Sequence, residues 1–180
     1  MSSGVVDGYQ ASFPGTAFCT CEYTKWGFWG GEVRVPGGDF RRDRIHLANW
    51  VAGVLPNIAI VPTGEATFGG HVIGTAQNNG AMYVATGSFT NAYNFGTRSG
   101  NFAMTFDGRS AGGTVDAPKV PGADWRHYTG ALTGTGVTGA VNGSFYGKTT
   151  VGAPVPQETG GNFTLNGTNY KASGIFAGKR

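Results

Sequence analysis

The sequence predicts an all-β protein: a small closed antiparallel β-barrel of about eight strands, with one short helix near residues 43–54. Short segments alternate aromatic or β-branched residues with polar ones, the period of a strand with one buried face. Turn dipeptides such as Asn79-Gly80 and Asp107-Gly108 separate these segments at regular intervals. The chain also has 33 glycines among 180 residues, well above the roughly 7% of ordinary proteins. Glycine beside large aromatic residues lets a small barrel fill its interior.

The N-terminal region predicts a lead-in followed by a hairpin. Residues 1–15 are polar and contain glycine, so we expect an irregular segment before a single barrel domain at 16–180. The aromatic run at 20–29 predicts a strand. Gly30-Gly31 then predicts a hairpin turn, with a return strand at 32–35.

One segment has the pattern of a helix. Leu47, Val51 and Leu55 recur at i, i+4 and i+8, which places them on one helical face. Asp43 is a suitable N-cap, and Gly53 or Pro56 would stop the helix. We therefore predict a helix near 43–54 whose apolar face packs against the barrel mouth.

From Gly64 onward the pattern is that of strands and turns. Turns are predicted at Asn78-Asn79-Gly80, at Asp107-Gly108, at Gly134-Thr135-Gly136 and at Asn166-Gly167. The segments around these turns predict strands at 66–74 and at 81–87, with 89–95 either extending the latter or forming another strand. Further strands are predicted at 102–106, 110–115, 126–133, 137–145, 162–165 and 170–178. Prolines mark two longer loops, at 116–124 and 148–159.

Charge and hydropathy exclude two classes of protein. The formal net charge is +3, and the one basic cluster, Arg41-Arg42-Asp43-Arg44, is interrupted by an acid. Nucleic-acid binding normally needs a dense basic face, so this class is not expected. No apolar stretch reaches the 18 residues of a transmembrane helix.

The two cysteines form the motif Cys19-Thr20-Cys21. On a strand, residues i and i+2 lie about 6.5–7 Å apart, at or beyond the upper limit of roughly 6.8 Å for an unstrained disulfide. We therefore expect free or intermolecular thiols. A strained internal bridge and half of a metal site remain open alternatives.

The last third of the chain resembles the C-terminal β-barrel of transferrin-binding protein B and its relatives among Gram-negative surface proteins. Three motifs carry the resemblance: a strand around Phe145-Tyr146, a turn and strand that begin at Glu158, and a closing strand that ends in Lys179-Arg180. The matching positions are Gly143, Phe145, Tyr146, Gly147, Glu158, Gly160, Gly161, Phe163, Gly174, Phe176, Gly178 and Arg180.

The resemblance implies an eight-stranded barrel in which these residues are structural. It also implies an extracellular or outer-surface location on a Gram-negative bacterium, as a domain of a longer chain. Relatives of this type bind host iron proteins, complement regulators or haem, often through loops or a separate handle domain. The first 60 residues of this chain are too short for the elaborate handle of the largest members.

No constellation of residues predicts catalysis, so an enzyme is not expected. Ser110 fits the letters of a G-x-S-x-G elbow, but a turn precedes it and Gly112-Gly113 follows, where the elbow needs a strand and a helix. The three histidines, at 46, 71 and 127, have no metal-ligand spacing. A three-histidine site assembled by the fold remains an alternative, although no cofactor is predicted.

Haem capture is the sharper small-ligand hypothesis, because it needs an axial histidine or tyrosine beside an apolar slot. His46 is predicted on the helix near Trp50, and His127 lies between Trp125 and Tyr128. These two histidines are the candidate haem ligands. An exposed position that binds nothing is the alternative reading of each.

The sequence therefore favours a monomeric, non-enzymatic module for ligand binding or display, with a protein ligand contacting loops 36–44, 116–124 and 148–159. A structural C-terminal cap of a longer secreted protein is the first alternative, and a haem- or metal-binding protein is the second. Exposed aromatic residues on the loops would favour binding. A smooth polar surface would favour the cap, and a histidine facing an open apolar cleft would favour haem.

Overall fold

The computed structural model describes residues 19–35, 41–149 and 155–180, with the backbone alone at 28–35 and 41–48. All the regular structure in these residues is β. The ten strands are β1 (Thr24–Val35), β2 (Arg41–Gly53), β3 (Glu65–Asn78), β4 (Ala81–Asn94), β5 (Ser99–Phe106), β6 (Arg109–Asp116), β7 (His127–Gly134), β8 (Val137–Tyr146), β9 (Glu158–Gly167) and β10 (Tyr170–Lys179).

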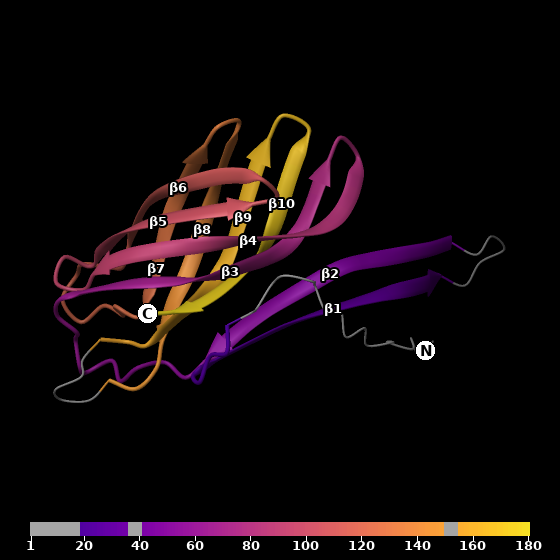
Figure 1. Ribbon diagram of the computed structural model, residues 1–180. Helices are drawn as coiled ribbons and strands as arrows, with labels where there is room; N and C mark the ends of the chain where they lie inside the picture. The colour runs from indigo at the N-terminus through magenta and orange to yellow at the C-terminus, as the bar shows by residue number, and fades with distance from the viewer. Residues whose placement is uncertain (1–18, 36–40, 150–154) are drawn as a thin grey trace.

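Strands β3 to β10 form a closed antiparallel barrel (Figure 1). Each strand pairs with its neighbour in sequence, and β10 pairs with β3 to close the ring, from Tyr170 opposite Asn78 to Lys179 opposite Gly69. The predicted eight-stranded barrel is therefore confirmed. Closure leaves no unpaired sheet edge around the ring, which is the main hazard of an open sheet.

The up-and-down topology gives the barrel two different ends. At one end, here called the turn end, two-residue turns join β3 to β4, β5 to β6, β7 to β8 and β9 to β10. At the other, the loop end, longer connections run through 54–64, 95–98, 117–126 and 147–157, and the C-terminus lies there too. The turns have positive φ at Asn and Gly residues, which adopt it readily, as at Asn79 (50°) and Gly80 (85°).

The barrel interior is a packed aromatic core. Phe145 has ring neighbours Tyr93, Phe95, Tyr128 and Phe68, at centroid distances of 4.7, 4.8, 4.9 and 5.5 Å. Glycines make room for these rings, since a Cβ at position 143 would overlap the ring of Tyr128. Burial raises the pKa of Tyr93 to about 12, which fits a phenol enclosed by apolar rings.

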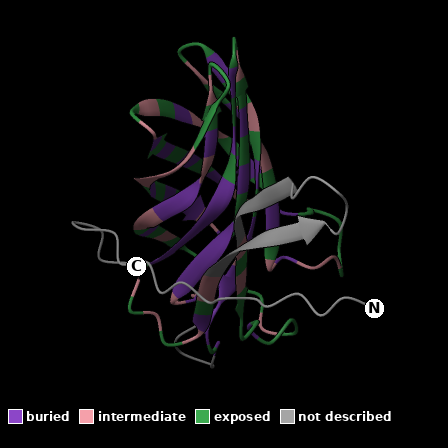
Figure 2. Ribbon diagram, turned by 90° about the vertical axis from the view of Figure 1, so that its right-hand side faces the viewer, coloured by how far each residue is buried: buried purple, intermediate pink, exposed green. Residues whose placement is uncertain are grey.

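The first two strands form a separate hairpin whose base lies against the outside of the barrel and which extends away from it (Figures 1 and 2). Its base covers apolar residues that alternate with the core positions and point outward: Ile73, Ile175 and Ala177, each under 8% exposed. Val51 packs against this face, and a Cβ at Gly160 would lie 3.0 Å from the Val51 Cγ2 atom. The hairpin therefore has its own small apolar contact with β3, β9 and β10.

The predicted helix near 43–54 is wrong, because this segment is strand β2. Asp43 is not a cap but pairs with Val33, and Val51 pairs with Trp26. The i, i+4 spacing that suggested a helix is an even number, so Leu47 and Val51 share a face of a strand as well. Pairing with β1 decides between the two, as tertiary context commonly overrides a weak helical pattern.

The predicted turn at Gly30-Gly31 is also wrong. Strand β1 continues to Val35, and the ladder shifts register between Trp29 and Gly31. Glycine in a strand often marks such an irregularity. Similarly, the last hairpin turns after Asn166-Gly167, which belongs to β9; Asn169 provides the positive φ of 55°.

Cys19 and Cys21 form a disulfide, contrary to the expectation of free thiols. The error came from placing them on a strand. They lie in the irregular segment before Thr24, where their Cα atoms are 5.1 Å apart, inside the usual range of about 4.4–6.8 Å. The bridge closes a tight loop at the entrance of the hairpin.

Candidate functional site

Exposed aliphatic side chains lie on two connections at the loop end, which a hydrogen bond between Trp125 and Ile58 joins. Four belong to the segment 54–64 and one to the loop 117–126. They are Val54 (58% exposed), Leu55 (37%), Ile58 (43%), Val61 (49%) and Val120 (68%). We call these five residues the apolar loop surface. Exposed apolar residues grouped in this way mark interaction sites more often than singly scattered ones do.

The segment 54–64 is fixed by hydrogen bonds to its backbone carbonyls. The indole Nε1 of Trp125 donates to the Ile58 oxygen at 3.0 Å, and Arg126 Nη1 donates to the Pro56 oxygen at 3.1 Å. At the end next to the hairpin, Val54 N donates to Tyr23 O and Val54 O accepts from Gly147 N. The segment is thus tied to the loop 117–126, to the hairpin and to the residue that follows β8.

The loop 117–126 is held in the same manner. Arg98 Nη1 donates to the Pro118 oxygen at 2.6 Å, and Ala117 N donates back to Arg98 O at 3.0 Å. Arg126 binds the carboxylate of Asp124 through both Nε and Nη2, each at 2.7 Å. These hydrogen bonds lower the pKa of Asp124 to about 2, because they favour its charged form.

Glu158 clasps the hairpin to the barrel. Its carboxylate is 3% exposed and accepts hydrogen bonds from the backbone N–H groups of Glu22, Tyr23 and Thr24. Charge-assisted bonds of this kind are roughly twice as strong as neutral ones. Since Tyr23 in turn accepts the N–H of Val54, the clasp also helps to position the apolar loop surface.

His127, one of the two haem candidates, lies at the start of β7 on the outer face. Its Nδ1 is 2.7 Å from Ser144 Oγ, and its Nε2 is 3.5 Å from Asp124 Oδ2. The side chain is 50% exposed. Both ring nitrogens therefore have protein partners, and these contacts connect β7, β8 and the loop 117–126.

His46 lies on strand β2 rather than on a helix, and its side chain is outside the described part of the structure. The structure therefore does not bring His46 and His127 together in any described contact. Within residues 19–27, 49–149 and 155–180, no three His, Cys, Asp or Glu side chains form a group that could hold a metal ion. The haem proposal for both histidines stays a prediction.

The residues that carried the sequence resemblance divide into two groups. One group points inward and builds the core: Gly143, Phe145, Gly161, Phe163, Gly174 and Phe176. The other lies beneath the hairpin base or beside it, and contains Tyr146, Gly147, Glu158 and Gly160. Gly178 belongs with the inward group, since a Cβ there would meet the core ring of Phe89. Arg180 is outside both groups, and its N–H donates to Gln157 O at 3.2 Å.

Of the three predicted recognition loops, 116–124 is described in full, and 148–159 and 36–44 are described in part. The loop 116–124 contributes Val120 to the apolar loop surface. In 148–159, Gln157 bonds both the N–H and the carbonyl of Lys148, and residues 150–154 lie outside the described part. Of 36–44, residues 36–40 are likewise outside it, and 41–44 belong to β2.

Sequence reasoning missed the segment 54–64. A signal was present, because apolar residues stand between Pro56 and Pro62 without strand alternation. Such residues have no sheet face on which to be buried. The helix predicted at 43–54 hid this signal, since it assigned Leu55 to a core-facing row.

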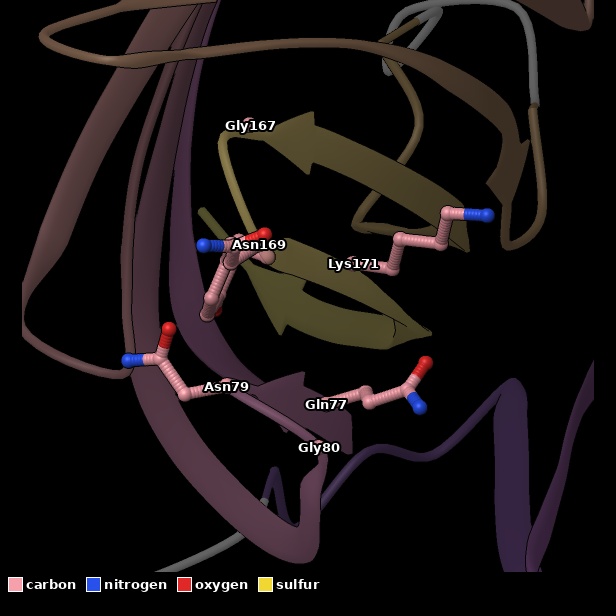
Figure 3. A pocket seen from close by; sticks show the side chains of 7 residues that line it. Gln77, Asn79, Gly80, Gly167, Asn169 and Lys171 are labelled. Carbon is pink, nitrogen blue, oxygen red and sulfur yellow. The ribbon is translucent and has the colours of Figure 1, made fainter.

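The turn end has a different kind of surface. A hollow of about 580 Å³ lies between the β3–β4 and β9–β10 turns. Figure 3 shows the Gln77 and Lys171 side chains extending the same way from neighbouring strands, with the amides of Asn79 and Asn169 on the other side. These exposed groups are polar, and Met82 is the one large apolar side chain exposed among the described residues at this end.

Comparison with known proteins identifies the fold but no close relative. No protein-family model and no curated protein matches the sequence. Among solved structures, the haemoglobin receptor HpuA from Kingella denitrificans in complex with human haemoglobin aligns with a TM-score of 0.56 and 19% identity. The apo form of the same receptor aligns with a TM-score of 0.54.

Transferrin-binding protein B from Haemophilus parasuis, described as a vaccine antigen, aligns with a TM-score of 0.57 and 16% identity. The alignment with HpuA in the complex includes 94% of this chain and 59% of the HpuA chain. The alignment with the transferrin-binding protein includes 89% of this chain and 33% of that protein's chain. The chain thus spans between a third and three fifths of these proteins. The resemblance to the transferrin-binding protein B barrel is confirmed at the level of the fold.

Proposed function

We propose that this chain is a non-enzymatic binding module that takes a protein ligand at the loop end of its barrel. The observation that carries the proposal is the apolar loop surface, five exposed aliphatic side chains on backbone fixed by hydrogen bonds. A rigid loop loses little conformational entropy on binding, so its exposed apolar groups are well suited to recognition.

The fold supports the choice of ligand to test first. HpuA and transferrin-binding protein B are described as a haemoglobin receptor and a transferrin-binding protein. We therefore propose haemoglobin and transferrin as the first candidates. We also propose an outer-surface or secreted location in a Gram-negative bacterium, a single domain at 16–180 within a longer chain, and a monomer in solution.

The two alternatives have less support in the described residues. A purely structural cap does not call for grouped aliphatic side chains in solvent. For haem capture, the exposed ring of His127 is engaged by Ser144 and Asp124.

No helix long and apolar enough to cross a membrane occurs among the described residues.

The test is binding of the purified chain to immobilised human haemoglobin and to transferrin by biolayer interferometry. Ile58→Asp and Val120→Asp each place a charge on the apolar loop surface, and we expect them to weaken binding at least about tenfold. Met82→Asp is the matched control, because Met82 is 51% exposed at the turn end. Equal loss in the control, or no saturable binding of either protein by the wild type, would overturn the proposal.

A further inference from the structure

Trp50 is an exposed tryptophan on the hairpin, near the base that lies against the barrel. It lies near the end of β2, pairs with Gly27 of β1, and is 47% exposed. A Cβ built at Gly27 would come within 2.8 Å of three atoms of the Trp50 ring system. The indole therefore lies against the backbone of Gly27, and a side chain at this position would push it away.

This arrangement is costly for a structural role alone. Glycine inside a strand weakens it, and a half-exposed tryptophan leaves a large apolar area in water. The other face of the hairpin, with Thr24 and Val51, already makes the contact with the barrel. Trp50 faces away from that contact, because strand residues alternate between faces. The hairpin thus presents one side of a large flat ring to solvent.

Trp50 continues the apolar loop surface. Only three residues separate it from Val54, and that length of extended chain spans about 13 Å at most. Ala52 between them, Val54 itself and Leu55 beyond are all exposed. Tryptophan is among the residues most enriched at binding hot spots, which lie near the centre of an interface.

The charges around this surface are mainly positive. Lys25 lies two residues from Gly27 on the same strand, and Lys148 extends towards the Tyr23 ring at 6.0 Å. Both ammonium groups are exposed, and neither has a carboxylate partner among the described residues. Among the nearby carboxylates, those of Asp124 and Glu158 are occupied by Arg126 and by backbone N–H groups. The exposed carboxylate of Glu22 lies beside Tyr23, where its hydrogen bond raises the pKa of that phenol. A partner with carboxylates around an apolar patch would match this pattern.

We propose that Trp50, seated on Gly27, is the central anchor of the interface, and that the ligand is a folded protein whose contact surface is apolar with an acidic rim. The inference rests on the proposed function, since it names the hot spot and the partner chemistry of the same site. It extends that site from the loop end onto the solvent face of the hairpin.

The experiment measures affinity and rates for human haemoglobin and transferrin with four variants. Trp50→Ala removes the ring, and Trp50→Phe keeps a smaller one. Lys25→Glu with Lys148→Glu reverses the charge of the rim, and Met82→Ala is the control at the turn end. We expect Trp50→Ala to lose at least about tenfold in affinity, mainly through faster dissociation, and Trp50→Phe to lose less. The lysine variant should slow association, and added salt should weaken wild-type binding.

The possible outcomes separate the two ideas. If Ile58→Asp and Val120→Asp abolish binding but Trp50→Ala binds like wild type, the inference is wrong and the proposed function stands. If the wild type binds neither protein, the proposed function is wrong and the inference falls with it. Wild-type association that is indifferent to salt and to the lysine reversal rejects the acidic partner. Unchanged amide exchange in the barrel of Trp50→Ala shows that any loss reflects binding rather than unfolding.

Discussion

The two ends of the barrel are built by different means. At the turn end, two-residue turns such as Asn79-Gly80 hold neighbouring strands together, and the residues that form each turn are adjacent in sequence. At the loop end, the connections are held by contacts between distant residues, such as Trp125 with Ile58 and Arg126 with Pro56. The exposed side chains differ as well: polar amides at the turn end (Figure 3), aliphatic groups at the loop end.

The two ends differ in what fixes their backbone, and therefore in which side chains they can expose to solvent. Local turn chemistry fixes the register of the strands and leaves few apolar groups outside the core. Loops fixed by long-range hydrogen bonds can hold apolar side chains in solvent, because their positions do not depend on the burial of those side chains. The exposed aliphatic groups of the loop end therefore agree with the binding surface proposed there, and the turn end is the part of the barrel with which to compare it.

The largest expected effect is on the free energy of unfolding, and it should differ between the two halves of the core. Phe145 has four aromatic neighbours, all of them near the loop end, whereas the ring of Phe163 near the turn end has Phe106 as its aromatic neighbour at 5.0 Å. Both are buried. We expect Phe145→Ala to lower the free energy of unfolding by about 4–5 kcal/mol and Phe163→Ala by about 3 kcal/mol. Urea unfolding measures both, and an equal or larger loss for Phe163→Ala would contradict the comparison.

The second prediction concerns the clasp between hairpin and barrel. Glu158→Gln removes the charge and one acceptor oxygen, so we expect the attachment of the hairpin to weaken by about 1.5–3 kcal/mol. Amide exchange at Tyr23 and Thr24 should then accelerate, while exchange in β5 and β6 stays unchanged. Glu22→Gln is the control, because Glu22 is exposed and contributes its backbone N–H to the same clasp. If the whole barrel exchanges faster, the hairpin belongs to the same cooperative unit.

The same contrast explains what could be predicted from sequence. The turns at Asn79-Gly80 and Asp107-Gly108 were predicted because dipeptide chemistry alone specifies them. The eight-stranded barrel followed from strand alternation between such turns. By contrast, β2 was predicted as a helix, because Leu47 and Val51 fit both periods and only pairing with β1 decides between them.

The candidate site was harder to predict because its contacts are non-local. The hydrogen bond between Trp125 and Ile58 joins residues 67 positions apart, and the clasp of Thr24 by Glu158 joins residues 134 apart. Neither leaves a local pattern. The loop 116–124 was predicted from its prolines. The exposure of Trp50 depends on its register opposite Gly27, which the sequence does not show by itself.

The third prediction places the same backbone strain at each end. Gly80 and Gly122 have φ of 85° and 79°, and nothing lies within 4 Å of a Cβ added at either. An alanine therefore meets only the cost of a left-handed conformation, about 1–2 kcal/mol. We expect Gly80→Ala to show that full loss in urea unfolding, because its turn is locked between two paired strands. Gly122→Ala should lose less than half as much, since its loop can relax without breaking the ladder. Equal losses would mean that the loop end is as rigid as the turn end.

The smallest expected effect is a loosening of the loop end alone in acid. The pKa of Asp124 is lowered to about 2 in the folded state by hydrogen bonds from Arg126, against roughly 3.9 in an unfolded chain. The Asp124 contribution is therefore fully present above pH 4 and is lost as the pH falls through 2. Because this carboxylate is about a third exposed, solvent screening keeps the effect small.

Between pH 4 and 2, amide signals of 117–126 should shift and exchange faster while those of the β3–β4 turn stay constant. In Asp124→Asn the amides of 117–126 should already exchange fast at pH 4, and their exchange should not change further between pH 4 and 2. If the wild-type turn end loosens over the same pH range, protonation acts on the barrel as a whole, and the two ends do not respond independently.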